Sequence, residues 1–262
     1  METAQEPMSQ KDIFSRSARR RFRDRAVDSE ASDRWLNQLM VEELVDRLGV
    51  VKRNFDRALI LGDCGGALAA SLAARGIKIV VADAGFRACL LTCGVQCDED
   101  RLPFANASFD LIIAPGGLDT VNDLPGALFL IRHILKADGL FLGAMSGAGS
   151  LATLRAILGT TDETVARHHP QIDVRAAGDL LARAGFTLPV AEHRSITARY
   201  PSLFRVIADL RANAMTNALA IRHPLRRDQI AEIAHRFLIP GTQKTEEVFS
   251  LIFMTGWAAN IA

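Results

Sequence analysis

The chain has 262 residues, of which 49% are hydrophobic and 23% charged, and it carries a formal net charge of +1. A chain of this length and apolar content can bury its own core as one large domain, while its balanced charge gives no strong nucleic-acid signal. No apolar run reaches the roughly 18 residues of a membrane span, and the first residues do not resemble a secretory signal.

A cluster of basic residues lies near the start, and we assign residues 1–31 to a basic N-terminal arm and residues 32–262 to the main domain. The arm's arginines are Arg16, Arg19, Arg20, Arg21, Arg23 and Arg25. Such a run forms either a solvated helix face or an arm that docks on an acidic surface. The acidic residues Glu2, Glu6 and Asp12 disfavour a third interpretation, a transit peptide.

Residues 57–76 read as a strand, a glycine turn and a helix. They follow an amphipathic helix that we predict from Ser32, a good N-cap, to about Gly49. Gly62 and Gly66 in the turn would let the backbone approach a ligand at the carboxyl end of a parallel strand. The G-x-x-G-G spacing fits neither the dinucleotide fingerprint nor a P-loop, so an ordinary tight turn remains the alternative.

A second strand at residues 77–82 ends in Asp83, roughly twenty residues beyond the glycines. A carboxylate at that position suits the two hydroxyls of a nucleoside ribose, each of which can donate a hydrogen bond to it. The alternative is a simple strand-end or N-cap aspartate.

Strands and helices continue to alternate, which predicts an α/β fold with a mostly parallel sheet and right-handed crossovers. Strands are expected at residues 94–97, 109–114, 140–144, 186–198 and 246–257, and helices at residues 125–136, 153–158 and 176–184. The segment between the last two strands, residues 201–240, is predicted to be a mostly helical insertion.

The cysteines and histidines do not predict a metal site. Cys64, Cys89, Cys93 and Cys97 lie in one short stretch, which is a poor disulfide framework and indicates a reducing compartment, taken here as the cytoplasm. The last three have a spacing unlike that of zinc or iron–sulfur ligands, so we interpret them as small buried hydrophobic residues. No histidine motif suggests iron or zinc, and we expect no protein-ligated metal.

The run DEDRLPFANASFDLIIAPGGLDTVNDLPGALFLIRHILKADGLFLG, residues 98–143, resembles class I S-adenosylmethionine methyltransferases that act on small molecules and malonyl carrier protein. The resemblance implies a Rossmann-like sheet of about seven strands, the last antiparallel. It also implies S-adenosylmethionine as cofactor, with Gly62 and Gly66 at the methionine end, Asp83 on the ribose and Asp98 facing the adenine amino group.

Motifs elsewhere in the chain are similar to the methyltransferase-fold assembly factors of mitochondrial complex I and their bacterial relatives. They include NDLPGAL, GAGSLATLR, AGDLLARAGF, YPSLFRVIADL, TNA and MTGW, in the same order along the chain. For those assembly factors, the resemblance implies arginine hydroxylation of a complex I subunit in place of demonstrated methyl transfer.

The chain departs from the family pattern around the glycine turn. Ile60 stands where an acid is expected, and Cys64 stands where a glycine is expected and adds a side chain close to the ligand. Either the neighbouring Asp63 supplies the lost negative charge, or the site is vestigial. A His-Trp pair common after the fourth strand is Asp119-Thr120 here, and Asp119 is the only candidate general base near the transferred methyl group.

The leading prediction is therefore an S-adenosylmethionine-binding protein of the methyltransferase family, with a cofactor site formed by Gly62, Asp63, Cys64, Gly66, Asp83 and Asp98. The arginines of the arm and of the insertion favour a protein or other macromolecular substrate. The alternative is an assembly factor for a respiratory complex subunit that binds its partner or hydroxylates arginine, with a degenerate cofactor site.

Overall fold

The structure is a computed structural model that describes residues 12–62, 66–159, 166–238, 241 and 243–259. Within these residues it contains a seven-stranded sheet with the order β3-β2-β1-β4-β5-β7-β6. The strands are β1 (Arg57–Leu61), β2 (Lys78–Asp83), β3 (Val95–Gln96), β4 (Phe109–Pro115), β5 (Leu135–Ser146), β6 (Phe186–Tyr200) and β7 (Thr245–Ala258). Only β7 runs antiparallel to its neighbours β5 and β6. The α/β fold with an antiparallel last strand is confirmed.

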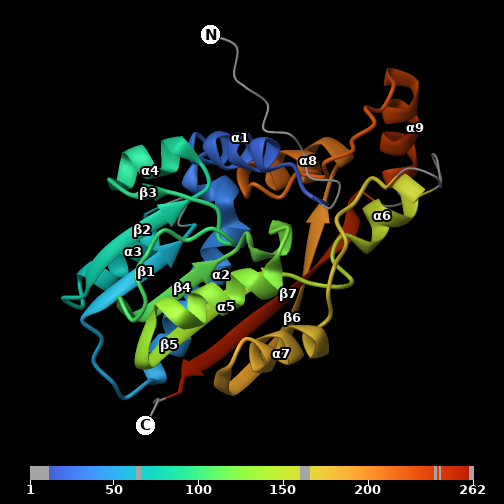
Figure 1. Cartoon of the computed structure of the whole chain (residues 1–262). Coiled ribbons are helices and arrows are strands. Elements are labelled where there is room, and N and C mark those ends of the chain that lie inside the picture. Colours follow the sequence, from blue (N-terminus) through green and yellow to red (C-terminus); the bar gives the residue numbers. More distant parts are fainter. Residues whose placement is uncertain (1–11, 63–65, 160–165, 239–240, 242, 260–262) are drawn as a thin grey trace.

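Helices cover both faces of the sheet (Figure 1). They are α1 (Arg16–Val27), α2 (Trp35–Val50), α3 (Ala67–Ala73), α4 (Phe86–Thr92), α5 (Leu124–Ile134), α6 (Ala152–Gly159), α7 (Val174–Arg183), α8 (Leu203–Ala212) and α9 (Arg227–Phe237), with short 3₁₀ turns η1 (Ala31–Arg34) and η2 (Leu118–Thr120). Helices α2, α3, α8 and α9 bury apolar residues in one core layer, and α5 and α7 in the other.

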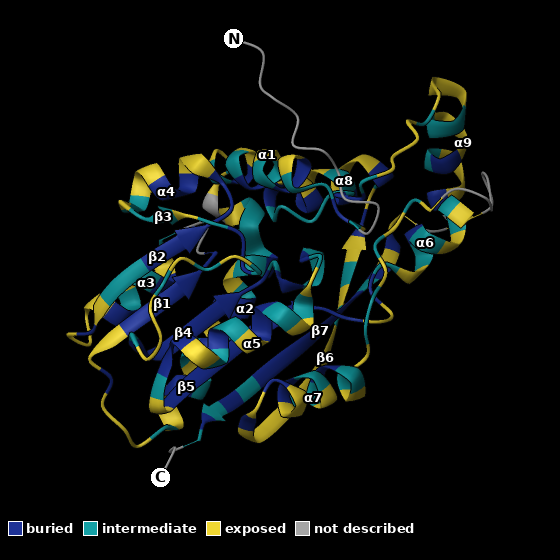
Figure 2. Cartoon of the chain, viewed as in Figure 1, coloured by how far each residue is buried: buried dark blue, intermediate teal, exposed yellow. Residues whose placement is uncertain are grey.

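The two core layers follow from the central strands, which are apolar on both faces. All seven residues of β4 are buried, as parallel strands between two helix layers require. Along β1, Ala58 and Ile60 enter one layer and Leu59 and Leu61 the other, because successive side chains of a strand point to opposite faces. Figure 2 shows the central strands buried beneath helices with exposed outer surfaces, while the edge strand β6 is largely exposed.

Local signals fix several element ends as the sequence predicts. Asp123 caps α5, accepting a hydrogen bond from the Gly126 amide at 2.8 Å, and Gly62 and Gly66 both adopt a positive φ. Three elements differ from expectation. The prediction of Ser32 as an N-cap is wrong, because Ser32 lies within the 3₁₀ turn η1 and α2 begins at Trp35 with Arg34 at its N-cap position. Strand β5 begins at Leu135, five residues early, because Leu135 pairs with Phe109 across a register irregularity, and α4 was not predicted.

Helix α1 crosses the carboxyl ends of the parallel strands, beside α4 and α8 (Figure 1). Its entry is held by backbone pairing with the insertion: the Ser15 amide donates to the Ala218 carbonyl, and the Ala220 amide donates to the Ile13 carbonyl, both at 2.8 Å. Ser15 also caps the helix through the Ala18 amide. In the described part of the chain, no helix is both long and apolar enough to span a membrane.

Candidate functional site

Carboxylates gather at the carboxyl ends of β2 and β3. Asp83 is the last residue of β2 and pairs in register with Gln96 of β3, so the acids that follow β3 lie beside it. Asp83, Asp98 and Glu99 expose only 2%, 2% and 3% of their surface. Buried carboxylates are costly unless they are paired, and their partners therefore decide what this edge can bind.

The partners come from one face of α1. Arg16, Arg19, Arg20 and Arg23 follow the spacing that places side chains on one side of a helix. They contact Asp100, Glu99, Asp98 and Asp83 respectively. We call this set the arginine row, and the four carboxylates the acidic edge. The interpretation of the arm as a solvated helix face is wrong for these residues, because Arg19 and Arg23 are both only 5% exposed. The acidic surface on which the row docks belongs to the chain itself.

Two of these arginine–carboxylate pairs are bidentate. Arg23 donates from Nε to Asp83 Oδ1 and from Nη2 to Asp83 Oδ2, each at 2.6 Å. Arg16 binds both oxygens of Asp100 at 2.6 and 2.7 Å. Burial is the largest single influence and would raise the pKa of Asp100, but the hydrogen bond from Arg16 and the charges of Arg16 and Arg19 together outweigh it and leave that pKa below its ordinary value.

Asp98 is less completely paired. Its Oδ2 accepts a hydrogen bond from Arg20 at 2.7 Å. Its buried Oδ1 accepts no hydrogen bond from the described residues, and Arg19 Nη1 lies 3.6 Å away. A buried oxygen left in this state retains the capacity to accept a hydrogen bond from a ligand.

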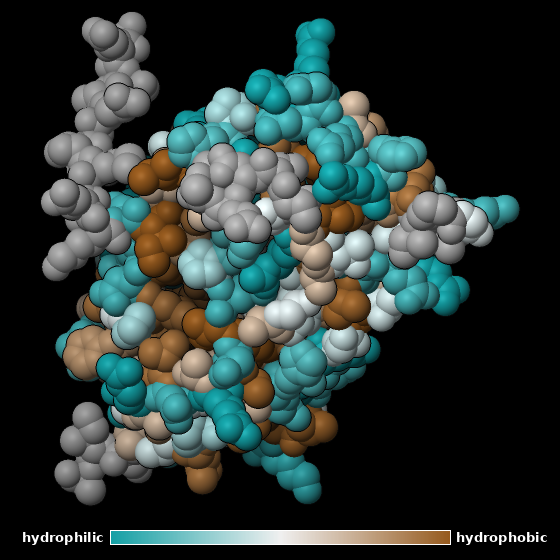
Figure 3. Space-filling model, turned by 90° about the vertical axis from the view of Figure 1, so that its right-hand side faces the viewer, coloured by the Kyte–Doolittle hydropathy of each residue, from teal (hydrophilic) through white to brown (hydrophobic). Residues whose placement is uncertain are grey.

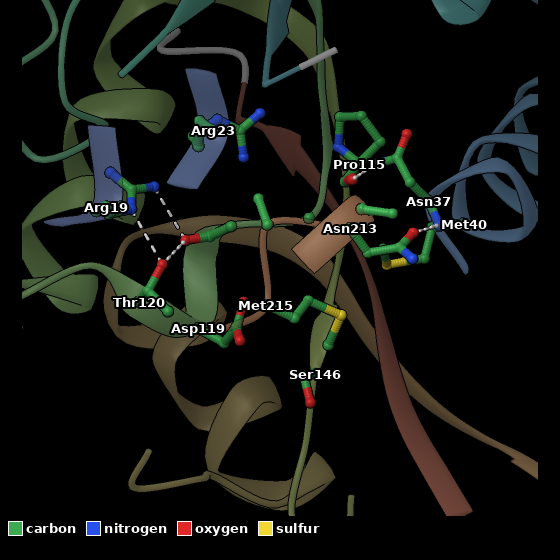
Figure 4. Close-up of a pocket in the computed structure, with 14 residues that line it drawn as sticks. Arg19, Arg23, Asn37, Met40, Pro115, Asp119, Thr120, Ser146, Asn213 and Met215 are labelled. Atoms are coloured by element: carbon green, nitrogen blue, oxygen red, sulfur yellow. Dashed lines mark hydrogen bonds between the residues drawn. The ribbon is translucent and has the colours of Figure 1, made fainter. Parts of the chain in front are cut away.

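Arginine side chains also cover the glycines. A Cβ atom added at Gly62 would lie 2.7 Å from Arg23 Nη2, and one added at Gly117 would lie 3.2 Å from Arg23 Nη1. The space that these glycines open above β1 and β4 thus holds the Arg23 guanidinium. Arg19 fixes the turn after β4, donating to the Gly117 carbonyl and to Thr120 Oγ1 at 3.0 Å each (Figure 4).

Asp119 lies in η2, at the junction of two cavities. The smaller, about 30 Å³, is lined by Arg19, Arg23 and Met40 among others, and the larger, about 210 Å³, by residues of α6, α8 and the segment 167–171. Asp119, Ser146 and Met215 line both cavities, and Figure 4 shows the three side chains near one another. Burial raises the pKa of Asp119 to about 6, so this carboxyl group titrates close to neutral pH.

The larger cavity combines apolar walls with polar groups. Leu151, Leu154, Leu158, Ile207 and Leu210 supply the walls, and Arg155, Arg167, His168 and Gln171 the polar groups. His169 also lines it, accepts a hydrogen bond from the Ala218 amide at 2.8 Å, and has its pKa lowered to about 4 by burial. Figure 3 shows the side of the molecule that carries α6, α8 and α9, where hydrophobic patches are bordered by hydrophilic side chains.

The structure brings together most of the residues predicted to form the site. Gly62, Gly66, Asp83 and Asp98 lie along the carboxyl edge of β1, β2 and β3, with Asp119 after β4. Asp63 and Cys64 lie outside the described residues. One related prediction is wrong: Cys93 is exposed, and only Cys89 of the described cysteines is buried. Among the described residues, no three His, Cys, Asp or Glu side chains are grouped as a metal site requires.

Sequence reasoning missed the arginine row and Asn122 as parts of the site. The side chain of Asn122 makes two hydrogen bonds to the backbone of Phe14. Its Oδ1 accepts from the Phe14 amide at 2.8 Å, and its Nδ2 donates to the Phe14 carbonyl at 3.0 Å. The helical spacing of the four arginines indicates that they share one face of a helix. The carboxylates that this face binds could not be recognised, because the acidic edge is assembled from residues about 60 to 84 positions away.

Comparisons with known proteins identify the family to which the chain belongs. Residues 59–143 match the methyltransferase domain family. The human mitochondrial arginine-hydroxylase NDUFAF5 is 31% identical over 264 residues, covering 94% of this chain and 76% of that protein. The chain belongs to the methyltransferase-domain family of NDUFAF5. This NDUFAF5-family chain is also similar to a malonyl-[acyl-carrier protein] O-methyltransferase from Methylovorus, with 29% identity over 232 residues that cover 80% of this chain and 77% of that protein.

Solved structures show the same fold as this NDUFAF5-family chain. The YcgJ protein of Bacillus subtilis superposes with a TM-score of 0.58 at 15% identity, covering 84% of this chain and 99% of its own. A phosphoethanolamine N-methyltransferase of Haemonchus contortus, solved with S-adenosylhomocysteine, gives a TM-score of 0.50 at 14% identity, covering 91% of this chain and 60% of its own. At such identities the likeness concerns the fold alone.

Proposed function

We propose that this chain binds S-adenosylmethionine along the carboxyl edge of β1, β2 and β3. The observation that carries the proposal is the pair of buried carboxylates, Asp83 and Asp98, at the ends of adjacent strands. Asp83 would accept from the ribose hydroxyls, and the unpaired Oδ1 of Asp98 would accept from the adenine amino group. Gly62 and Gly66, together with the undescribed Asp63 and Cys64, would border the methionine end.

The residues at the carboxyl ends of β1, β2 and β3 suit this cofactor, whereas α1 in its docked position blocks access to them. Both oxygens of Asp83 are held by Arg23, whose guanidinium also covers Gly62. The cofactor, when bound, supplies a methyl group on an already activated sulfonium. The protein then has mainly to align an acceptor and exclude water, effects that can be worth several kcal/mol, on the order of 7 for good alignment.

We further propose that the acceptor belongs to a protein and enters the larger cavity. Apolar walls with Asp119 among the lining residues suit an extended side chain with a polar or cationic head. Asp119 would hold this head or remove its proton, because its pKa of about 6 leaves it mostly charged at neutral pH. A partner with an acidic surface is supported by the exposed arginines 222, 226 and 227 of the insertion.

A second candidate is an assembly factor that does not methylate, and the docked arginine row favours it. If Arg23 never leaves Asp83, the two residues form a structural ion pair, and Asp83 is not available to a cofactor. The name of the relative NDUFAF5 adds arginine hydroxylation as the chemistry that such a protein could perform. Both candidates share the larger cavity as the binding site for a protein side chain.

Titration calorimetry with S-adenosylmethionine separates the two candidates. Because Arg23 holds Asp83 in this structure, binding is measured in the wild type and in the Arg23→Gln background, each with and without Asp83→Asn. Asparagine cannot accept both ribose hydroxyls as a carboxylate does, and loss of such a charge-assisted contact costs about 1.5–3 kcal/mol, so affinity should fall about tenfold or more. The exposed Asp179→Asn is the matched control. Absence of binding in both the wild type and folded Arg23→Gln would refute the proposal.

A further inference from the structure

We propose that α1 is an intramolecular competitor of the cofactor: the Arg23 guanidinium and the ribose hydroxyls use the same carboxylate, Asp83, and the cofactor binds when the Arg23 end of α1 withdraws. This inference rests on the proposed function. It adds that the arm, and not only the glycine turn, sets the affinity of the site.

The first support is that three of the roughly four acceptor positions of Asp83 are in use. Its Oδ1 accepts from Arg23 Nε at 2.6 Å and from the Gly85 amide at 2.7 Å, and its Oδ2 accepts from Arg23 Nη2 at 2.6 Å. A carboxylate offers about four acceptor positions, and the planar fork of arginine blocks approach along the whole outer edge. A ribose cannot bind this carboxylate through both hydroxyls while Arg23 is in place.

The second support is space. Arg23 Nη2 would lie 2.7 Å from a Cβ at Gly62, and Arg23 Nη1 would lie 3.2 Å from a Cβ at Gly117. The guanidinium therefore fills the approach to the turn after β1 as well as the approach to the turn after β4. Competition at Asp83 and steric exclusion at the glycines act at the same position.

The third support is the way α1 is held. Its buried residues are Ala18, Arg19, Arg23 and Ala26. The two alanines and the half-buried Phe22, which packs against Ala218 and Leu219, bury a modest apolar area, so withdrawal of the Arg23 end forfeits a limited hydrophobic free energy. Buried ion pairs roughly balance Coulombic gain against desolvation, so a ligand that takes over one carboxylate can shift the balance.

The fourth support is an asymmetry between the two ends of α1. The entry is fixed by Phe14 on Asn122 and by Ser15 on Ala218. Beyond Arg23, side chains hold the helix: Asp24 accepts from the Arg87 amide at 2.8 Å, Arg34 donates to the Ala26 and Val27 carbonyls at 3.4 Å, and Arg25 makes an exposed hydrogen bond to Thr216 at 3.0 Å. An exposed ion pair between Asp28 and Arg87 adds to these contacts. The start of α1 is thus fixed by backbone pairing, whereas its other end is held by side-chain contacts, several of them exposed, that must break when Arg23 withdraws. We call α1 in this arrangement a latch.

The test compares variants of the full chain in calorimetric titrations with S-adenosylhomocysteine. Arg23→Gln removes the competing charge and should bind about tenfold more tightly, because apparent affinity scales with the fraction of molecules whose site is open. Arg23→Lys keeps a charge but loses the fork, and should fall between. Arg21→Gln lies on the exposed side of the same helix and should match the wild type.

A second readout needs no substitution and is therefore independent of any folding defect. Amide hydrogen exchange across residues 16–27 of the wild type should become faster when S-adenosylhomocysteine is added. If Arg23→Gln and Arg23→Lys bind no more tightly than the wild type, or if the cofactor protects α1, the latch is refuted while the proposed function stands. Absence of binding in every folded variant refutes both.

Discussion

Asp119 is a residue whose environment sets a measurable chemical property. Burial raises its pKa to about 6, while its own backbone amide and the cationic Arg19 and Arg23 lower it by smaller amounts. Since the folded pKa lies above the ordinary value of 3.8 for this carboxyl group, folding disfavours the charged form. The penalty is absent well below pH 3.8, where the carboxyl group is protonated in both states, grows as pH rises from 3.8 to about 6, and is complete above that.

We therefore predict that Asp119→Asn is more stable than the wild type at neutral pH and that the two converge at low pH. The shift of about two pKa units corresponds to at most about 3 kcal/mol at 1.36 kcal/mol per unit. Urea unfolding from pH 4 to pH 8 measures the difference, with the exposed Asp179→Asn as control. A difference in the free energy of unfolding that stays constant with pH would contradict the prediction.

At the scale of residues, the sequence predicts carboxylates better than their partners. Asp83 and Asp98 could be placed because each follows directly from the end of its strand, and parallel strands align their ends. Arg23 could not be assigned to Asp83, since a helical row of arginines is equally compatible with solvent. Docking depends on the position of α1 over the sheet, which only the assembled fold determines.

At the scale of elements, one side chain supports the entry of α1 in addition to the backbone pairing with the insertion. Asn122, next to the α5 cap Asp123, makes two hydrogen bonds to the backbone of Phe14. The Phe14 ring also packs edge-on against His169, with centroids 5.2 Å apart. Asn122 therefore connects the loop after η2 to the arm, and the arm in turn contacts the larger cavity through His169.

We predict that Asn122→Ala loosens α1 without unfolding the domain. Loss of two neutral hydrogen bonds costs about 1–3 kcal/mol at roughly 0.5–1.5 each, and this loss falls on the docking of the arm. Hydrogen exchange across residues 16–27 should accelerate, while exchange across β4 stays unchanged. Asn106→Ala, in an exposed loop, is the matched control. Equal exchange of α1 in both variants would show that Asn122 does not hold the arm.

The order and type of the elements were predictable because apolar periodicity and caps are local signals. The early start of β5 was not, since Leu135 joins the strand only through its pairing with Phe109. Helix α4 was hidden in the cysteine-rich stretch, where Phe86, Leu90 and Leu91 remain exposed and give no amphipathic pattern. Long-range pairing and exposure are properties that a single sequence does not display.

At the scale of the whole molecule, the arm, the sheet edge and the insertion meet around one site. The arm pairs with residues 218–220 of the insertion, and its arginines pair with the acids after β2 and β3. Cofactor binding, arm position and global stability are therefore coupled. A ligand that binds only the folded state adds stability according to its concentration relative to its dissociation constant.

This coupling predicts opposite effects of Arg23→Gln with and without ligand. Without ligand the variant should be less stable than the wild type, because removal of one partner leaves Asp83 buried without its cation, a change that costs about 3–5 kcal/mol. At one fixed concentration of S-adenosylhomocysteine it should gain more stability than the wild type. A tenfold lower dissociation constant adds about 1.4 kcal/mol once ligand is in excess.

Urea unfolding of both proteins, with and without ligand, measures the two differences, and Arg21→Gln should follow the wild type in each. An equal gain in the wild type and in Arg23→Gln would mean that Arg23 and the ligand do not compete, however unstable the variant is.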